Sequence, residues 1–430
     1  MLKKIAAIIG TILCCTLVAR ADEPATQPEN APTPKFFTFG VESPENESVD
    51  ITELIALTQW VKSNNDPILS ILISRNGKVV YQLYTSGLDP QEAHYIFSAS
   101  KSVLSALTGV CIDRKLLPPT STPINQMLPR DWFPSDTAYT TFGTVTLKDV
   151  LAMSALDAPI APHFTTPEAI KRNLDYFYAE NRTKYALTQK VFRHPGKDFL
   201  YTDVTCALVS GAIECATHQS LFDFGNSALF EPMGFENQEW MHEDRSGIDN
   251  GAYGLRLRPI DMQKFGVLYL NQGTWDGKQL ISPAWVHESY HPWIATEAMF
   301  LKHPNYGSYW WKVYHAPNGW TGEDAIGWKG QYIAVFSKWN TVVTMTALFE
   351  DNGENAVFTQ IIKNFVAPAI VKKELYVRPD EATLAAQKQQ LAALLDQIQS
   401  APSRLKRNDE NRVIPSIEPK ESHHPFEGGL

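Results

Sequence analysis

The chain has 430 residues, of which 44% are hydrophobic and 20% are charged. This is long enough to bury a sizeable core in one large domain with an insertion, or in two domains. The formal net charge is −9, whereas a nucleic-acid-binding protein is expected to carry a basic stripe, so the composition argues against a nucleic-acid partner.

Residues 1–21 have the pattern of a secretory signal peptide. Lys3 and Lys4 form a positively charged start, residues 5–18 are apolar, and small residues at positions 19 and 21 would permit cleavage. The apolar run is short for a membrane span. We therefore expect an exported protein, periplasmic or extracellular, with no membrane span after cleavage. A retained N-terminal anchor is the alternative.

Export implies an oxidising setting for the cysteines of the mature chain. These are Cys111, Cys206 and Cys215. An odd number leaves at least one thiol free or paired between chains. We interpret them as small buried hydrophobic residues and leave a Cys111–Cys206 disulfide open.

The first predicted elements follow a stretch with the composition of a linker. Residues 22–50 contain five prolines among polar residues, which is typical of a linker. Apolar residues at helical spacing then predict an amphipathic helix over residues 51–61. Two strand-like runs, 68–74 and 78–84, flank Asn76-Gly77, the favoured pair for a type I′ turn. The order is therefore a helix followed by a β-hairpin.

The rest of the chain predicts a mostly helical stretch that lies between strands. A helix opens at about residue 98, helices and loops dominate to about residue 300, and strands return before a closing helix. The expected late elements are strands 309–315, 331–337 and 341–348 and a helix over 356–371. Strands at both ends predict an α+β fold, in which a central antiparallel sheet built from both chain ends is flanked by helices. We assign this domain to residues 51–371, its mostly helical insert to about 103–300, and a polar helical or disordered tail to 372–430.

The segment 97–102 places a serine and a lysine on one face of the predicted helix. Ser98 and Lys101 are three residues apart, which makes them neighbours on a helix. A lysine held neutral can accept the proton of a serine and so activate it as a nucleophile. The spacing alone is weak, because Ser403 and Lys406 repeat it in the polar tail. A helix cap and a solvated lysine are the alternative.

Three further segments could complete such a site. Tyr201 follows a Pro-Gly turn and could carry a proton to a leaving group, although a core tyrosine is the alternative. Asp203, two residues on, could orient Lys101 or the substrate. An acyl oxyanion needs two N–H donors, and the segment from Gly327 to Gly330 could bring a second backbone donor next to that of Ser98. A plain turn is the alternative there.

Several of these segments resemble a known family in order and spacing. They are 97–102, 145–151, 194–203, 254–262, 275–281 and 330–333. Together they resemble the serine β-lactamase-related family, which includes class C β-lactamases, D-alanyl-D-alanine carboxypeptidases, esterases and 6-aminohexanoate-dimer hydrolases. The stretch 254–281 is most similar to the branch of the esterases and 6-aminohexanoate-dimer hydrolases. The resemblance implies a β-lactamase/transpeptidase-like fold, with Ser98 as the acylated nucleophile, Lys101 as its base and Tyr201 as the proton carrier.

The chain departs from the family pattern in two places. The second motif has Asp203 where asparagine is more usual, and a carboxylate there would raise the pKa of Lys101. The third motif falls on Ala325-Ile326-Gly327, without the cation that would meet a substrate carboxylate, and it leaves Trp328 N–H as the second oxyanion donor. Lys329 could replace that cation if its side chain turns towards the site.

These observations predict an exported serine hydrolase that cleaves an ester or amide through an acyl-enzyme on Ser98. The substrate would be a small or peptide-like molecule. We expect no metal or cofactor, because no metal-ligand spacing appears in the sequence, and no partner protein is indicated. The alternatives are a β-lactamase or D,D-peptidase acting on penicillins or peptidoglycan, and a non-catalytic binding or sensor protein on the same fold.

Overall fold

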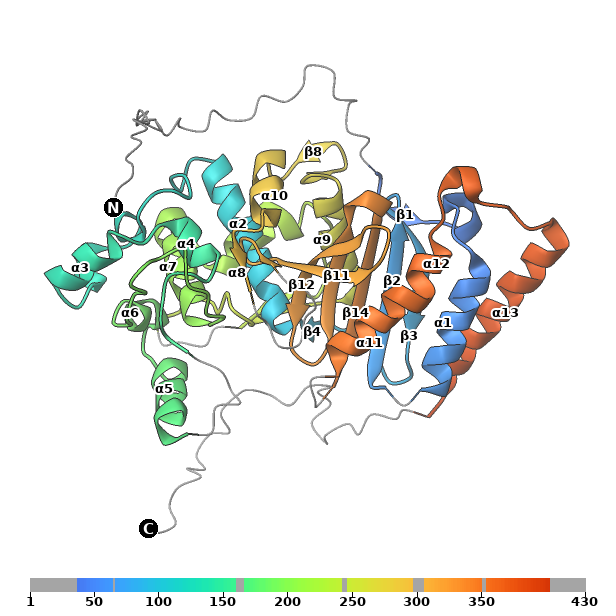
Figure 1. Ribbon diagram of the computed structural model, residues 1–430, viewed down its shortest axis with the longest axis horizontal. Helices are drawn as coiled ribbons and strands as arrows, with labels where there is room; N and C mark the ends of the chain where they lie inside the picture. Colours follow the sequence, from blue (N-terminus) through green and yellow to red (C-terminus); the bar gives the residue numbers. More distant parts are fainter. Residues whose placement is uncertain are drawn as a thin grey trace, which may run out of the picture. The chain divides into compact units, whose positions relative to one another are not determined.

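A mixed sheet of nine strands runs through the computed structural model, in the order β1-β3-β2-β14-β13-β12-β11-β10-β9 (Figure 1). The structure describes residues 37–64, 66–159, 166–241, 246–296, 305–349 and 353–402. The predicted signal peptide at 1–21 and the second serine–lysine pair at Ser403 and Lys406 lie outside the described residues.

The sheet joins the two ends of the domain, as predicted. Strand β2 (Ile68–Arg75) and strand β3 (Lys78–Tyr84) form the expected hairpin, and Asn76 and Gly77 both have the positive φ of a type I′ turn. Strand β14 (Thr341–Ala347) then pairs antiparallel with β2. The remaining strands are β13 (Gln331–Phe336), β12 (Trp320–Gly327), β11 (Trp311–Ala316), β10 (Asn305–Tyr306), β9 (Ile294–Ala295) and β1 (Gly40–Val41). All of these pairs are antiparallel except β1 with β3.

Strand β12 is the large element that the sequence prediction missed. Its eight residues include two glycines and two adjacent acidic residues, so they show no clean alternation of polar and apolar side chains. The strand forms because β11 and β13 pair with it on both sides. Tertiary pairing has overridden a weak local pattern here.

Helices cover both faces of the sheet (Figure 1). Strand β13 shows this by alternation, because Tyr332, Ala334 and Phe336 pack in one buried cluster, and Ile333 and Val335 pack in another. The first cluster includes side chains of α1 (Ile51–Ser63), α11 (Glu354–Ile361) and α12 (Ala367–Ala369). The second includes side chains of α2 (Ser100–Asp113), α7 (Val204–Thr217) and α9 (Pro259–Leu270). The sheet is therefore the middle layer of three.

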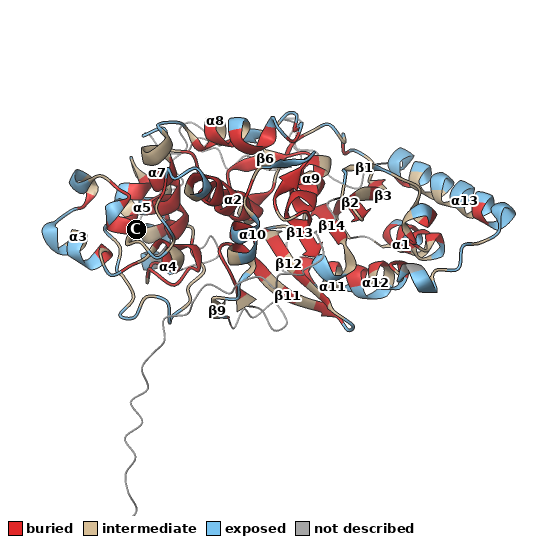
Figure 2. Ribbon diagram, turned by 90° about the horizontal axis from the view of Figure 1, so that it is seen from above, coloured by how far each residue is buried: buried red, intermediate tan, exposed pale blue. Residues whose placement is uncertain are grey.

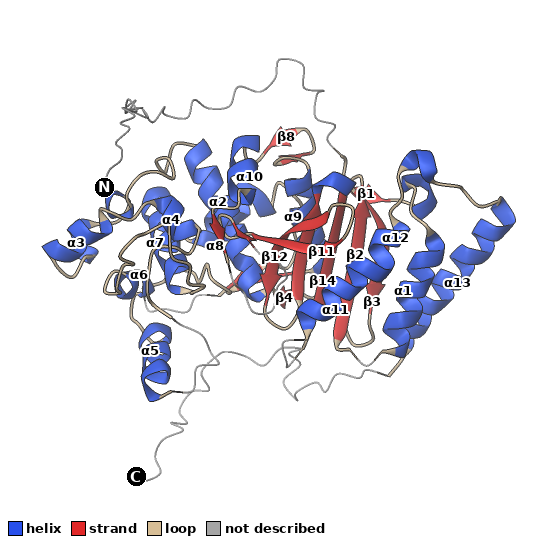
Figure 3. Cartoon of the chain, viewed as in Figure 1, coloured by secondary structure: helices blue, strands red, loops and turns tan. Residues whose placement is uncertain are grey.

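The segment between β3 and β9 is mostly helical (Figure 3). Besides α2, α7 and α9, its helices are α3 (Asp136–Phe142), α4 (Leu147–Leu151), α5 (Pro167–Phe177), α6 (Arg182–Ala186), α8 (Leu221–Gly225) and α10 (Pro283–Tyr290). Its short strands are β4 (His94–Tyr95), β5 (Glu239–Trp240), β6 (Leu255–Leu257), β7 (Thr274–Trp275) and β8 (Lys278–Gln279). Cys111 and Cys206 are buried and Cys215 is partly buried, and all three thiols are free.

The two flanking segments are also partly ordered against the domain. Residues 37–50, in the later half of the stretch expected to be a linker, contain β1 and a 3-10 turn. At the other end, α13 (Glu381–Ser400) packs along α1 and leaves most of its surface exposed (Figure 2). No helix in the described part of the chain has the length and apolarity needed to cross a membrane.

The contact between α2 and α10 leads to a prediction about stability. Gly109 lies in α2, and a Cβ atom there would stand 2.3 Å from ring carbons of Trp285. Because a buried ring cannot move aside freely, we expect Gly109→Ala to lower the free energy of unfolding by about 1–3 kcal/mol. Urea unfolding followed by circular dichroism measures this. Gly40→Ala is the matched control, because its Cβ would meet only the flexible Lys78 side chain, at 3.3 Å. Equal stability of the two variants would contradict the prediction.

Candidate active site

Ser98 lies in a 3-10 turn, Phe97–Ala99, that leads directly into α2. The predicted helix therefore starts two residues later than Ser98, while Lys101 is in its first turn. Phe97 has a φ of +47°, which is an unfavourable conformation for a bulky residue. Such strain persists only where the surroundings impose it, and it is concentrated at functional sites.

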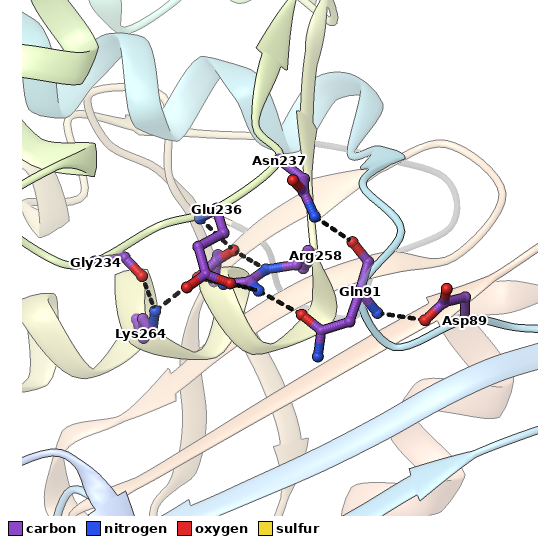
Figure 4. Close-up of polar contacts among 8 residues, drawn as sticks. Asp89, Gln91, Gly234, Glu236, Asn237, Arg258 and Lys264 are labelled. Atoms are coloured by element: carbon purple, nitrogen blue, oxygen red, sulfur yellow. Dashed lines mark hydrogen bonds and ion pairs between the residues drawn. The ribbon is translucent and has the colours of Figure 1, made fainter.

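The chain before Ser98 is anchored by a polar network around Arg258 (Figure 4). Arg258 donates from Nε to Asp261 Oδ2 at 2.6 Å and from Nη1 to Gln91 Oε1 at 2.6 Å. Asn237 also donates from Nδ2 to the Gln91 carbonyl oxygen, at 3.0 Å. Asp261 is fully buried and Arg258 is 4% exposed, whereas Gln91 and Asn237 are exposed, so the network runs from the interior to the surface. It fixes the segment that enters β4. The serine turn begins two residues after the end of β4.

Lys101 is the buried centre of the site. Its side chain is 1% exposed. Its Nζ lies 3.0 Å from Ser98 Oγ, 2.9 Å from the Ala252 carbonyl oxygen and 2.8 Å from Asp203 Oδ1. An ammonium has three N–H donors and no acceptor, so these three oxygens satisfy the charged form completely.

The environment of Lys101 favours that charged form. Burial alone would lower the pKa of Lys101, but its pKa is raised, and the charge of Asp203 is the largest of the effects that oppose burial. This is the effect expected of a carboxylate at position 203. Lys101 is therefore an ammonium at neutral pH in the free protein.

Tyr201 joins the pair from the segment just before α7. Its ring centroid is 5.0 Å from Lys101 Nζ, and Ser98 is among the groups that lower the pKa of its phenol. The ring stacks on Trp311 at 5.4 Å and meets Tyr306 at 6.2 Å. Burial raises the pKa of Tyr201, against the lowering effects of Lys101 and Ser98. The phenol is therefore neutral at rest.

Asp203 contacts Lys101, and orienting Lys101 is one of the two roles that the sequence predicts for it. It is the N-cap residue of α7, and its side chain is 18% exposed. Cys206, one turn further along α7, is buried, and burial raises the pKa of its thiol to about 12. The thiol is therefore neutral, and Asp203 is the negative charge that faces Lys101 most directly.

Gly327 brings the end of β12 against the serine turn. A Cβ atom at this position would lie 2.1 Å from the Ile96 carbonyl oxygen, so only glycine allows the strand to approach so closely. Trp328 follows, and its ring lies 5.5 Å from that of Phe97. The structure thus brings the residues expected to hold the oxyanion next to the turn that carries Ser98.

The third motif carries no cation inside the sheet. Ala325 is 1% exposed. Lys329, the possible replacement, places its Nζ 4.9 Å from the centre of the Trp328 ring. The Lys329 ammonium therefore lies at the edge of the site, against the Trp328 ring.

Two parts of this arrangement were not found from the sequence. The Ala252 carbonyl that accepts from Lys101 is a backbone group, so no side-chain motif could have indicated it. The aromatic residues behind Tyr201, Tyr306 and Trp311, lie in β10 and β11. Their positions depend on strand pairing far along the chain, which the motif spacing does not report.

Comparisons with known proteins agree with this geometry at the level of the fold. A Bacillus anthracis protein described as a "putative 6-aminohexanoate-dimer hydrolase" matches with a TM-score of 0.56 and 16% identity, over 86% of this chain and 89% of that chain. A penicillin-binding protein homologue from Caulobacter crescentus matches with a TM-score of 0.58 and 14% identity, over 74% of this chain and 97% of that chain. A hydrolase with promiscuous acyltransferase activity matches with a TM-score of 0.58 and 12% identity, over 74% of this chain and 98% of that chain.

Comparison with the curated proteins gives no match. The family model described as Beta-lactamase matches residues 57–357, which include every strand of the sheet except β1, the serine turn, Tyr201 and the end of β12. Because that match covers well over half of the chain and includes every element that builds the site, the protein belongs to the Beta-lactamase family.

Proposed function

We propose that the protein is an exported serine hydrolase that cleaves an ester or amide through an acyl-enzyme on Ser98. The observation that carries this proposal is the position of Lys101 Nζ, 3.0 Å from Ser98 Oγ and 2.8 Å from Asp203. A serine that only caps a helix has no need of a buried amine, and a solvated lysine would not be 1% exposed. The similar solved structures support the fold, and the family match supports hydrolase chemistry in general.

The first half of the reaction forms the acyl-enzyme. Ser98 Oγ attacks the carbonyl carbon and gives its proton to the Lys101–Tyr201 pair, and the carbonyl oxygen becomes an oxyanion. The Ser98 and Trp328 N–H groups stabilise that charge. The tetrahedral intermediate then collapses, the bond to the leaving group breaks, and the leaving alcohol or amine takes a proton from Tyr201.

The second half releases the acyl group. Water attacks the acyl carbon and gives a proton to the same pair, and Ser98 recovers a proton as the carboxylic acid leaves. The complete cycle consumes one water molecule and no net proton or electron. The pair must therefore be able to accept one proton at the start, although at rest Lys101 is an ammonium and Tyr201 is a neutral phenol. Loss of one proton from this pair produces the active form.

The alternatives within the family are less well supported by the third motif. A β-lactamase or a D,D-peptidase would be expected to present a cation to the substrate carboxylate, and Ala325 presents none. Turnover of nitrocefin, or a stable penicilloyl adduct on Ser98, would favour these activities.

A binding or sensor protein remains a candidate because the Asp203 charge holds Lys101 in its inactive, protonated form. Ligand binding without an acyl-enzyme would favour that role.

The acyl-enzyme is tested by replacing its nucleophile. We expect a fluorophosphonate probe to label the wild-type protein, and Ser98→Ala to abolish both labelling and turnover of p-nitrophenyl acetate. Intact-protein mass spectrometry measures the adduct. Ser63→Ala is the control, because Ser63 is an exposed serine in α1 and should leave labelling unchanged. Equal labelling of Ser98→Ala and wild type would remove the proposal.

The Lys101–Asp203 ion pair predicts the pH dependence of turnover. Because the pKa of Lys101 is raised, kcat/KM should rise with pH as the Lys101–Tyr201 pair loses its proton. In Asp203→Asn the carboxylate charge is gone and burial then lowers the pKa of Lys101. We therefore expect this rising limb to move to lower pH by about one unit or more.

The pH profile of kcat/KM from pH 5 to 11 measures this shift, because a limb that moves to lower pH raises kcat/KM at every pH along its slope. Asp198→Asn is the matched control, because Asp198 is an exposed carboxylate on the same segment and should leave the limb in place. An Asp203→Asn variant that folds, as judged by circular dichroism, yet keeps its limb in place or moves it to higher pH would contradict the prediction.

A further inference from the structure

The indole ring of Trp328 has no part in the chemistry proposed above, which uses only the backbone N–H of this residue. The side chain is 48% exposed, although it stands beside the serine turn. Tryptophan offers a large, rigid contact area at low cost in conformational entropy, and it is enriched where proteins bind ligands. The ring is therefore a candidate for contact with the substrate.

The ring is held in place by its neighbours. It meets Phe97 at 5.5 Å with an interplanar angle of 73°, and the ammonium of Lys329 lies 4.9 Å from its centre. The turn itself is closed by a hydrogen bond from Gly330 N to the Gly327 carbonyl oxygen at 3.3 Å. A surface fixed in this way loses little freedom when a ligand packs against it.

The position of the ring distinguishes the two sides of the scissile bond. The leaving group must reach Tyr201, whose ring stacks on Trp311, and Trp311 stands opposite Asp324 in the sheet. Gly327 lies three residues, or about 10 Å, further along β12 than Asp324. Trp328 comes after Gly327, at the turn into β13. The leaving group and the indole ring therefore belong to different ends of the site.

The charges near the ring indicate an uncharged ligand group. Ala325 offers no cation to a carboxylate at the third motif, and the Lys329 ammonium packs against the indole ring itself. We propose that Trp328 is a specificity-determining residue whose indole ring binds an uncharged aromatic or apolar acyl group. This inference rests on the proposed function and names the substrate class of the same site.

The test compares two esters that share the p-nitrophenolate leaving group. For p-nitrophenyl phenylacetate and p-nitrophenyl acetate, we expect the ratio of their kcat/KM values to fall by about tenfold or more in Trp328→Ala. Trp328→Phe keeps an aromatic ring and should restore most of the ratio. Leu375→Ala removes another exposed apolar side chain, on the segment after the domain, and should leave the ratio unchanged.

A second pair of substrates assigns the side of the bond. Vinyl acetate and p-nitrophenyl acetate share the acyl group and differ in the leaving group, so their ratio should not change in Trp328→Ala. An unchanged phenylacetate-to-acetate ratio, or a change confined to the leaving-group pair, would overturn the inference. Both results would leave the proposed function standing, since that depends on whether Ser98→Ala abolishes turnover of either ester.

Discussion

The ion pair between Lys101 and Asp203 is the interaction on which the site depends. A lysine that is 1% exposed has lost almost all contact with water, and a buried charge is stable only when it is paired and hydrogen-bonded. The carboxylate of Asp203, the hydroxyl of Ser98 and the carbonyl of Ala252 supply that compensation together. Removing one partner of such a pair typically costs about 3–5 kcal/mol, so the geometry around Ser98 is coupled to the stability of the domain.

The fold brings these partners together from three separate parts of the chain, and a fourth part, the end of β12, packs against the serine turn. This close approach is possible because Gly327 has no side chain that would clash with the Ile96 carbonyl oxygen. The start of α7 supplies Asp203, and the segment before β6 supplies the Ala252 carbonyl. The strained backbone of Phe97 is then tolerated because the residues on either side of it are fixed, by Ile96 N bonding to the Leu255 carbonyl and by α2 itself.

Much of this could be predicted from the sequence, because the informative signals are local. The hairpin is marked by Asn76-Gly77, and the pairing of serine with lysine by a spacing of three. Strand β12 could not be predicted, since its stability comes from two neighbouring strands rather than from its own residues. For the same reason the sequence could bring only the backbone of the segment from Gly327 to Gly330 near Ser98, whereas the structure places the Trp328 ring against Phe97 through strand pairing and the turn after Gly327.

The substitution of a carboxylate into the second motif changes the chemistry of the site without changing its shape. Asparagine and aspartate are nearly the same size, and either could accept a hydrogen bond from Lys101. Only aspartate adds a negative charge 2.8 Å from the amine, which stabilises the ammonium and so withholds the base that the reaction needs. The same charge compensates the burial of Lys101, because a neutral partner would leave a buried ammonium with dipoles alone. The charge of Asp203 therefore stabilises the fold and at the same time makes Lys101 a poorer base. The protonation equilibrium of Lys101 determines the pH at which Ser98 can be activated.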